Sequence, residues 1–237
     1  MWETMRLYSR YLAISLRAQT EYRLSFLLIA LGQLAATGIE FIGIWALFRR
    51  FGRLNGWELH EAAVLYGVVH VAFALAESIF RGFDQFAPLL KSGEFDRLLL
   101  RPRSTAFQVL ARELELGRVG RLLQGALVLF WGLSCLPGGV TLVTGVVTIS
   151  AIVGGIALFG GLFVLQATMA FWTIESLEIW NTLTYGGVET AQYPLSIYHP
   201  WFRRLFTFLI PLACINYFPV QIILGRQTLS DITRRMV

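Results

Sequence analysis

The sequence predicts an all-α membrane protein that forms a single domain over residues 1–237. Of these residues, 56% are hydrophobic and 15% are charged, and the mean hydropathy is +0.60. Soluble domains carry about 25% charged residues, and a soluble fold of this length could not bury so much apolar surface. The apolar residues also fall in runs long enough to cross a bilayer as helices.

Residues 1–22 form an amphipathic segment before the first long apolar run. Their apolar side chains recur at three- and four-residue spacing while the arginines fall elsewhere on the wheel, which predicts a helix in the headgroup region. The alternative is an irregular cytosolic extension. We do not expect a cleavable signal peptide, because Arg6, Arg10 and Arg17 interrupt the segment.

The next two apolar runs predict the first two membrane spans. Residues 24–48 reach about 37 Å at 1.5 Å per residue, which is enough to cross a bilayer with tilt. Arg49, Arg50 and Arg53 end this span. Residues 62–80 predict the second span, which is bounded by Glu61 and Arg81.

The third and fourth spans are separated by a Pro-Gly-Gly turn at residues 137–139. Residues 119–136 predict the third span. Residues 140–172 exceed one bilayer crossing, so we expect a long tilted helix or a helix with an interfacial extension. Glycines at 154, 155, 160 and 161 give this span a strip of small residues for close helix packing, within the chain or between chains.

The last two segments carry helix-breaking residues. Residues 179–193 are short for a span and contain Gly186, Gly187 and Glu189, which is typical of a broken or re-entrant element. Residues 205–224 predict the last span, bent by Pro211 and Pro219. With six crossings and a cytoplasmic N-terminus, most of the 20 basic residues lie inside, in agreement with the positive-inside rule. The C-terminus is then cytoplasmic as well.

The polar segment from residue 81 to residue 118 lies on the cytoplasmic side in this arrangement. Within it, residues 90–103 mix charged side chains with Phe and Leu, and residues 107–114 form a second amphipathic piece. Such a segment can enter a groove on a soluble subunit and transmit its movement to the adjoining spans. The alternative is an interfacial helix that only anchors the loop.

Residues 93–102 read Gly-Glu-Phe-Asp-Arg-Leu-Leu-Leu-Arg-Pro. This run resembles the G-E-F/I-D-x-L-L-x-R-P signature of a permease family within the ABC-2 class of ABC transporters. Further similarity extends in order to Gly225, through Phe-Trp-Thr at 171–173, Tyr-Pro at 193–194, Ile-Pro at 210–211 and Tyr-Phe-Pro at 217–219.

The resemblance implies an ABC exporter membrane subunit of the bacterial plasma (inner) membrane. It implies a type V exporter-like fold of six spans, with an N-terminal interfacial helix and a coupling helix between the second and third spans. Two permease chains, identical or homologous, would pair in the lipid bilayer, and each would dock on a separate ATPase that binds ATP and Mg²⁺. The residues carried over as the ATPase-docking element are Gly93, Glu94, Phe95, Asp96, Leu98, Leu99, Arg101 and Pro102.

The residues themselves exclude several other functions. Lys91 is the only lysine and does not follow a glycine, so no Walker A loop is present. The three histidines are isolated, and neither a zinc motif nor a nucleophile turn occurs. We therefore expect no cofactor or metal in this chain, no catalytic residue and no nucleic-acid partner.

Two acidic residues fall within predicted spans, where an ionised side chain costs at least about 2.5–3.5 kcal/mol unless it faces protein or water. Glu40 either lines a translocation path or bonds a partner helix. Glu77 lines that path or pairs with Arg81. Two other functions stay open from these residues: a proton-coupled secondary carrier that uses Glu40, and a non-transporting scaffold that recruits a cytosolic protein through the loop.

Overall fold

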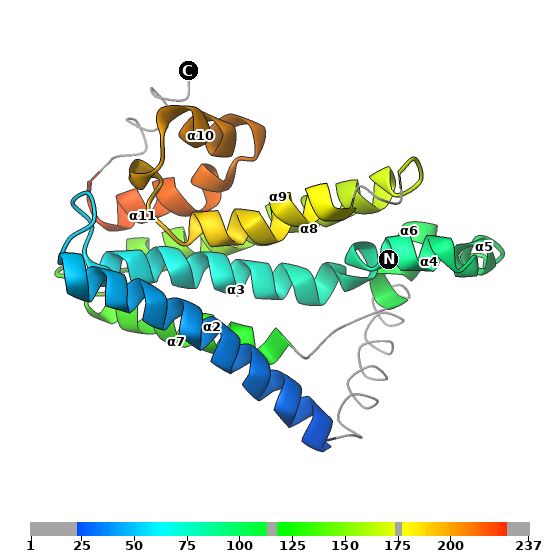
Figure 1. Ribbon diagram of the computed structural model, residues 1–237, viewed down its shortest axis with the longest axis horizontal. Coiled ribbons are helices and arrows are strands. Elements are labelled where there is room, and N and C mark those ends of the chain that lie inside the picture. The colour runs from blue at the N-terminus through cyan, green and yellow to red at the C-terminus, as the bar shows by residue number, and fades with distance from the viewer. Residues whose placement is uncertain (1–22, 113–117, 174–176, 227–237) are drawn as a thin grey trace.

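The computed structural model describes residues 23–112, 118–173 and 177–226, and within these ranges the chain is helical (Figure 1). No β-strand occurs in the described ranges, apart from an isolated bridge between Leu54 and Trp57. The expected interfacial helix at residues 1–22 lies outside the described residues. The all-helical prediction is confirmed.

Helix α3 (Leu59–Asp84) forms the centre of the bundle. It packs along its length against α7 (Val119–Ser134) on one side and α8 (Leu142–Met169) on the other (Figure 1). Residues from Ala62 to Phe73 on this helix are almost all fully buried. A helix that is apolar and buried on every side belongs to the interior of a bundle, and the sequence of α3 fits this position.

Glycines allow the close approach of these helices. A Cβ atom at Gly67 of α3 would lie 2.5 Å from Leu129 Cβ of α7, and one at Gly155 of α8 would lie 2.6 Å from Ala72 Cβ of α3. Part of the predicted glycine strip on α8 therefore packs within the chain.

The outer helices expose apolar side chains. Helix α2 (Arg23–Phe51) packs mainly on α7 and leaves Leu24 72% and Ile39 69% exposed. Such surface is compatible with lipid contact. Among the described residues, three helices are long and apolar enough to cross a bilayer, namely α2, α3 with its extension to Lys91, and α8. Helix α7 is apolar but shorter.

Helix α9 (Leu177–Ala191) differs from the sequence prediction. It runs without a break through Gly186 and Gly187. Its 15 residues reach about 22 Å, which is less than the hydrocarbon thickness of about 30 Å. The break expected in this segment occurs instead in the one that follows.

The last segment folds back on itself. After η3 (Leu195–Ile197), helix α10 (Pro200–Arg204) and π-helical η4 (Leu205–Leu209) form one arm, and π-helical η5 (Ala213–Tyr217) and α11 (Phe218–Ile223) form the other. The arms are bent by 86°. Ile210 between them has extended backbone angles, and Pro211 has no N–H to continue the helix.

Both ends of this segment lie at the same end of the bundle, and the bent pair of arms forms either a broken span or a re-entrant loop. The α2–α3 connection contacts both, because Asn55 Nδ2 donates to the Ser196 carbonyl at 2.8 Å and Arg226 Nη2 donates to the Gly56 carbonyl at 3.1 Å. Arg226 also pairs with Glu61 at 2.7 Å. The described chain therefore stops at the end of α3 opposite the loop of residues 81–118.

Candidate functional site

The loop between α3 and α7 lies at the far end of α3 and contains three short helices, α4 (Phe86–Lys91), α5 (Glu94–Leu99) and α6 (Thr105–Arg112) (Figure 1). Helix α3 bends at Phe80 before it enters the loop. Gly93 joins α4 to α5 and has a φ angle of +70°. Residues other than glycine adopt this left-handed backbone conformation only with strain. The glycine of the signature therefore sets the turn between these helices.

The inner face of α5 attaches the loop to the bundle. The Phe95 ring lies 5.1 Å from the ring of Phe86 and 5.4 Å from that of Phe171, which follows α8. Leu98 is buried with Val109 of α6 and Ala167 of α8. These contacts give the loop a small apolar core of its own, continuous with the end of α8.

The outer face of α5 is free of such contacts among the described residues. Asp96 is exposed, and Leu99 and Leu100 have exposed fractions of 57% and 86%. Two adjacent leucines held out on a short helix between charged residues form an apolar projection, which is a feature of surfaces that meet a partner or a membrane.

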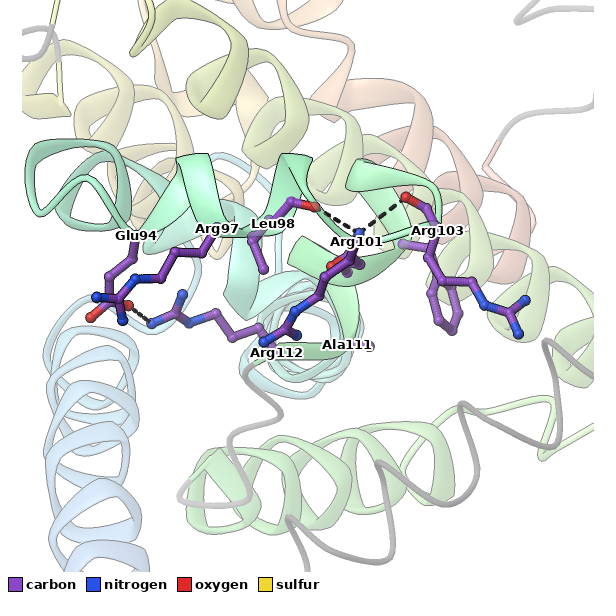
Figure 2. Close-up of a pocket in the computed structure, with 9 residues that line it drawn as sticks. Glu94, Arg97, Leu98, Arg101, Arg103, Ala111 and Arg112 are labelled. Carbon is purple, nitrogen blue, oxygen red and sulfur yellow. Dashed lines mark hydrogen bonds and ion pairs between the residues drawn. The ribbon is translucent and has the colours of Figure 1, made fainter.

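A basic hollow of about 410 Å³ lies between α5 and α6 (Figure 2). Gln108 holds its two sides together, since its Nε2 donates to the carbonyls of Leu98 at 3.1 Å and Arg103 at 3.0 Å. Its charged lining comprises Glu94, Arg97, Arg101, Arg103 and Arg112.

Glu94 and Arg112 form an ion pair across this hollow, as Figure 2 shows. The hydrogen bond from Arg112, together with its positive charge, holds the pKa of the Glu94 carboxyl below its ordinary value. The remaining arginines leave the hollow with a positive potential, which favours anionic groups such as carboxylates.

Glu77 lies at the base of the loop and is fully buried. Its Oε1 is 2.7 Å from Arg118 Nη2 and accepts a hydrogen bond from the Tyr185 hydroxyl at 2.9 Å, and its Oε2 is 3.3 Å from Arg121 Nη1. Arg81, the partner expected from the sequence, is 3.9 Å away. Glu77 therefore belongs to an interhelical ion cluster, and it does not line an open path in this structure.

Glu40 on α2 is half-buried and forms no ion pair with any of the described residues. It lies within electrostatic range of Glu189 on α9 and Arg121 on α7. Within the described part of the chain, no group of three or more His, Cys, Asp or Glu side chains is arranged to hold a metal ion.

A family model for ABC-2 family transporter proteins matches residues 34–235. The chain belongs to the ABC-2 family. Comparison with curated proteins and with solved structures gave no match. Members of the ABC-2 family are membrane transport components rather than the ATPase itself, and membership implies association with an ABC ATPase.

The geometry divides the eight signature residues of this ABC-2 chain into groups. Phe95 and Leu98 face inward, Gly93 makes the turn, and Glu94 and Arg101 line the hollow. The exposed remainder comprises Asp96, Leu99 and Pro102. Leu98 also lines the hollow, Phe95 is partly buried, and Gly93 is exposed, so the docking role of these residues stays a prediction.

Sequence reasoning missed two arginines of the hollow, Arg103 and Arg112. Arg103 directly follows the signature, and Arg112 comes from α6, where the sequence pattern drew attention only to the apolar face. Helical spacing gives a signal for part of this set, because residues 94, 97, 98 and 101 share one face, as do 108 and 112. The pairing of those two faces required the tertiary fold.

Proposed function

We propose that this chain is the membrane-spanning permease subunit of an ATP-driven exporter, a single membrane domain that forms the translocation path and couples to a separate ATPase. The observation that carries the proposal is the α5–α6 surface, where exposed Asp96, Leu99 and Leu100 adjoin the arginine-lined hollow. A permease needs a rigid contact with its soluble subunit. Here the contact surface is held on the bundle by Phe95 and Leu98.

Movement of the partner would reach the bundle by two covalent routes. The loop is continuous with α3 at Phe80 and with α7 at Arg118. ATP and Mg²⁺ would bind to the partner ATPase, and closure of that subunit would displace α5 and α6. Such displacement changes the permease only if the docked surface interacts differently with the two nucleotide states of the partner.

A second permease chain, identical or homologous, would complete the path. The exposed apolar face of α2 leaves surface for that chain as well as for lipid. We place the loop of residues 81–118 and the N-terminal segment on the cytoplasmic side of a bacterial plasma membrane, because that orientation puts most arginines inside. Half-buried Glu40 stays our candidate for the path.

The docking test uses two leucines that are both 86% exposed, Leu100 on the loop and Leu142 at the opposite end of the bundle. Leu100→Asp is expected to abolish co-purification of the ATPase from native membranes, whereas Leu142→Asp retains it. Asp96→Lys should act like Leu100→Asp without reducing membrane insertion. Equal amounts of ATPase with all three variants would contradict docking at this surface.

Flux measurements on the same purified chain distinguish the exporter from the two alternative functions, a secondary carrier and a scaffold. Flux that depends on Glu40 and continues without ATP would identify a secondary carrier. Stable partner binding without flux of any compound in reconstituted vesicles would identify a scaffold.

A further inference from the structure

The ion cluster around Glu77 lies between the two points where the loop joins the bundle. Glu77 precedes the Phe80 bend by one turn on α3, and Arg118 and Arg121 are at the start of α7. One carboxylate therefore bonds the helix that enters the loop to the helix that leaves it, at 2.7 Å and 3.3 Å.

Two neighbouring contacts extend this cluster to the other helices. Tyr185 of α9 donates to Glu77 Oε1 at 2.9 Å. Further along α3, Asp84 pairs with Arg81 at 2.5 Å and accepts from Gln166 of α8 at 3.4 Å. The end of α3 is thus bonded to α7, α8 and α9.

Burial makes these bonds strong and hard to replace. Glu77 has no exposed surface, and a buried carboxylate is stable as an anion only when it is paired and hydrogen-bonded. Removing one partner leaves the others less well compensated, so each lost bond weakens the whole cluster, and loss of the Glu77 charge weakens it most. A bond of this kind resists separation of α3 from α7 at the loop end.

The cluster is not needed to hold α3 and α7 together along the rest of their length. Gly67 and Gly125 bring these helices into direct contact, with a Cβ at Gly125 lying 3.1 Å from His70 Cβ. Loss of the Glu77 charge would therefore loosen the base of the loop while the two helices stay packed above it.

We propose that Glu77 is a positioning residue for coupling, which makes α3 and α7 follow the loop as one body when the ATPase moves it. This proposal rests on the proposed function as a permease. With the cluster intact, displacement of α5 is passed to α3, α7 and α9 together. Without the carboxylate charge, the loop moves at its two attachment points and the bundle does not follow.

The test measures the distance between two spin labels on either side of the cluster. In a background of Cys135→Ser and Cys214→Ser, the labels are attached at Ser92→Cys, on the exposed α4–α5 turn, and Leu127→Cys, which is 65% exposed on α7. The complex with its co-purified ATPase is compared without nucleotide and after trapping with ATP, Mg²⁺ and vanadate. In the otherwise unchanged chain, we expect the label distance to be the same in both states.

Glu77→Gln keeps the size of the side chain and removes its charge. We expect the ATPase to stay bound and the label distance to shift by about 1–5 Å on trapping, from a small helix shift up to the displacement of one helical turn. Glu77→Asp, which keeps the charge, should restore the constant distance. A role in folding alone would lower the amount of inserted complex and leave no nucleotide-dependent shift.

Two further variants keep the test decisive. Glu61→Gln removes the α3 ion pair with Arg226 at the opposite end of the helix and should behave like the unchanged chain. Tyr185→Phe removes one hydrogen bond to Glu77 and should give a smaller shift, which covers the case in which Glu77→Gln does not insert. A constant label distance in both Glu77→Gln and Tyr185→Phe overturns the proposal. Failure of the unchanged chain to retain any ATPase would instead overturn the permease function.

Discussion

Phe95 of α5 packs edge-on against Phe171 at the end of α8, with ring centroids 5.4 Å apart and an interplanar angle of 72°. This contact joins the signature segment to a residue 76 positions later in the sequence. Phe86 completes an aromatic triangle with both rings. The orientation of the exposed Asp96–Leu100 surface depends on this packing, because α5 has only six residues.

Replacement of Phe95 by Ala is expected to release α5 from the end of α8. Loss of a partly buried aromatic ring costs about 2 kcal/mol of local stability. Trypsin should then cleave the loop at its exposed arginines several times faster in inside-out vesicles. Phe95→Leu, which keeps much of the apolar volume, serves as the control. Identical cleavage rates for Phe95→Ala and the unchanged chain would exclude this anchoring role.

Gly93→Ala should weaken ATPase retention without altering any contact side chain. At φ +70, a Cβ atom adds about 1–2 kcal/mol of backbone strain, although it would meet no neighbouring atom within 4 Å. The strain shifts the relative orientation of α4 and α5. Gly38→Ala on α2 also meets no atom within 4 Å and has no such backbone angle, so retention there should be unchanged.

Acidification should loosen the α5–α6 pair through Glu94. Because its pKa is lowered by Arg112, the stability from this pair is fully present above the ordinary value of 4.5 and is lost as pH falls through the lowered pKa. Hydrogen exchange of the amides in α5 and α6 should stay slow at pH 5 and accelerate below the lowered pKa. In Glu94→Gln, exchange is faster at pH 7 and lacks this acid-dependent component. If exchange in Glu94→Gln still accelerated at low pH, a group other than Glu94 would be responsible for the acid dependence.

Gly67→Ala is expected to destabilise the bundle by about 1–3 kcal/mol through overpacking. The added Cβ would lie 2.5 Å from Leu129 Cβ and 2.6 Å from Leu129 Cα, so the backbone of α7 must move. Thermal unfolding in detergent measures the loss. Gly161→Ala on α8 meets no atom within 4 Å and should unfold at the same temperature as the unchanged chain.

The fold-back of the last segment predicts which introduced thiols share a side of the membrane. In a background without Cys135 and Cys214, Asn55→Cys and Arg226→Cys should react with a membrane-impermeant maleimide in intact cells. Ser92→Cys should react only after the membrane is permeabilised. Labelling of Arg226→Cys together with Ser92→Cys would show that residues 205–224 cross the membrane. Labelling of Ser92→Cys in intact cells would reverse the proposed orientation.

Helix positions were predictable where the apolar run was long and bounded by charge. Helix α2 ends at Phe51, beside the arginines that were expected to stop it, and α8 begins at Leu142, just after the Pro-Gly-Gly turn. The last segment was not predictable, because its apolar composition permits a crossing as well as a fold-back. The 86° bend and the contacts of Asn55 and Arg226 are tertiary features that the sequence pattern does not contain.

The signature run identified the loop from the sequence but not the role of each residue within it. Phe95 and Leu99 are both apolar members of the same motif, yet one packs against Phe171 and the other is exposed. The reason is that a six-residue helix has no hydrophobic pattern long enough to define its buried face. That face was set by packing against α6 and against α8, and α8 is distant in the sequence.

The sequence by itself determined that this chain is an apolar helical bundle of the ABC-2 family with one charged loop, since hydropathy and a contiguous motif are local properties. Only the tertiary structure decided that Glu77 bonds Arg118 and Arg121, that Arg112 completes the basic hollow with Glu94, and that the last apolar segment turns back. Each of these contacts joins side chains from different helices. Such contacts form only when the right faces of those helices meet, and the packing between helices fixes which faces meet.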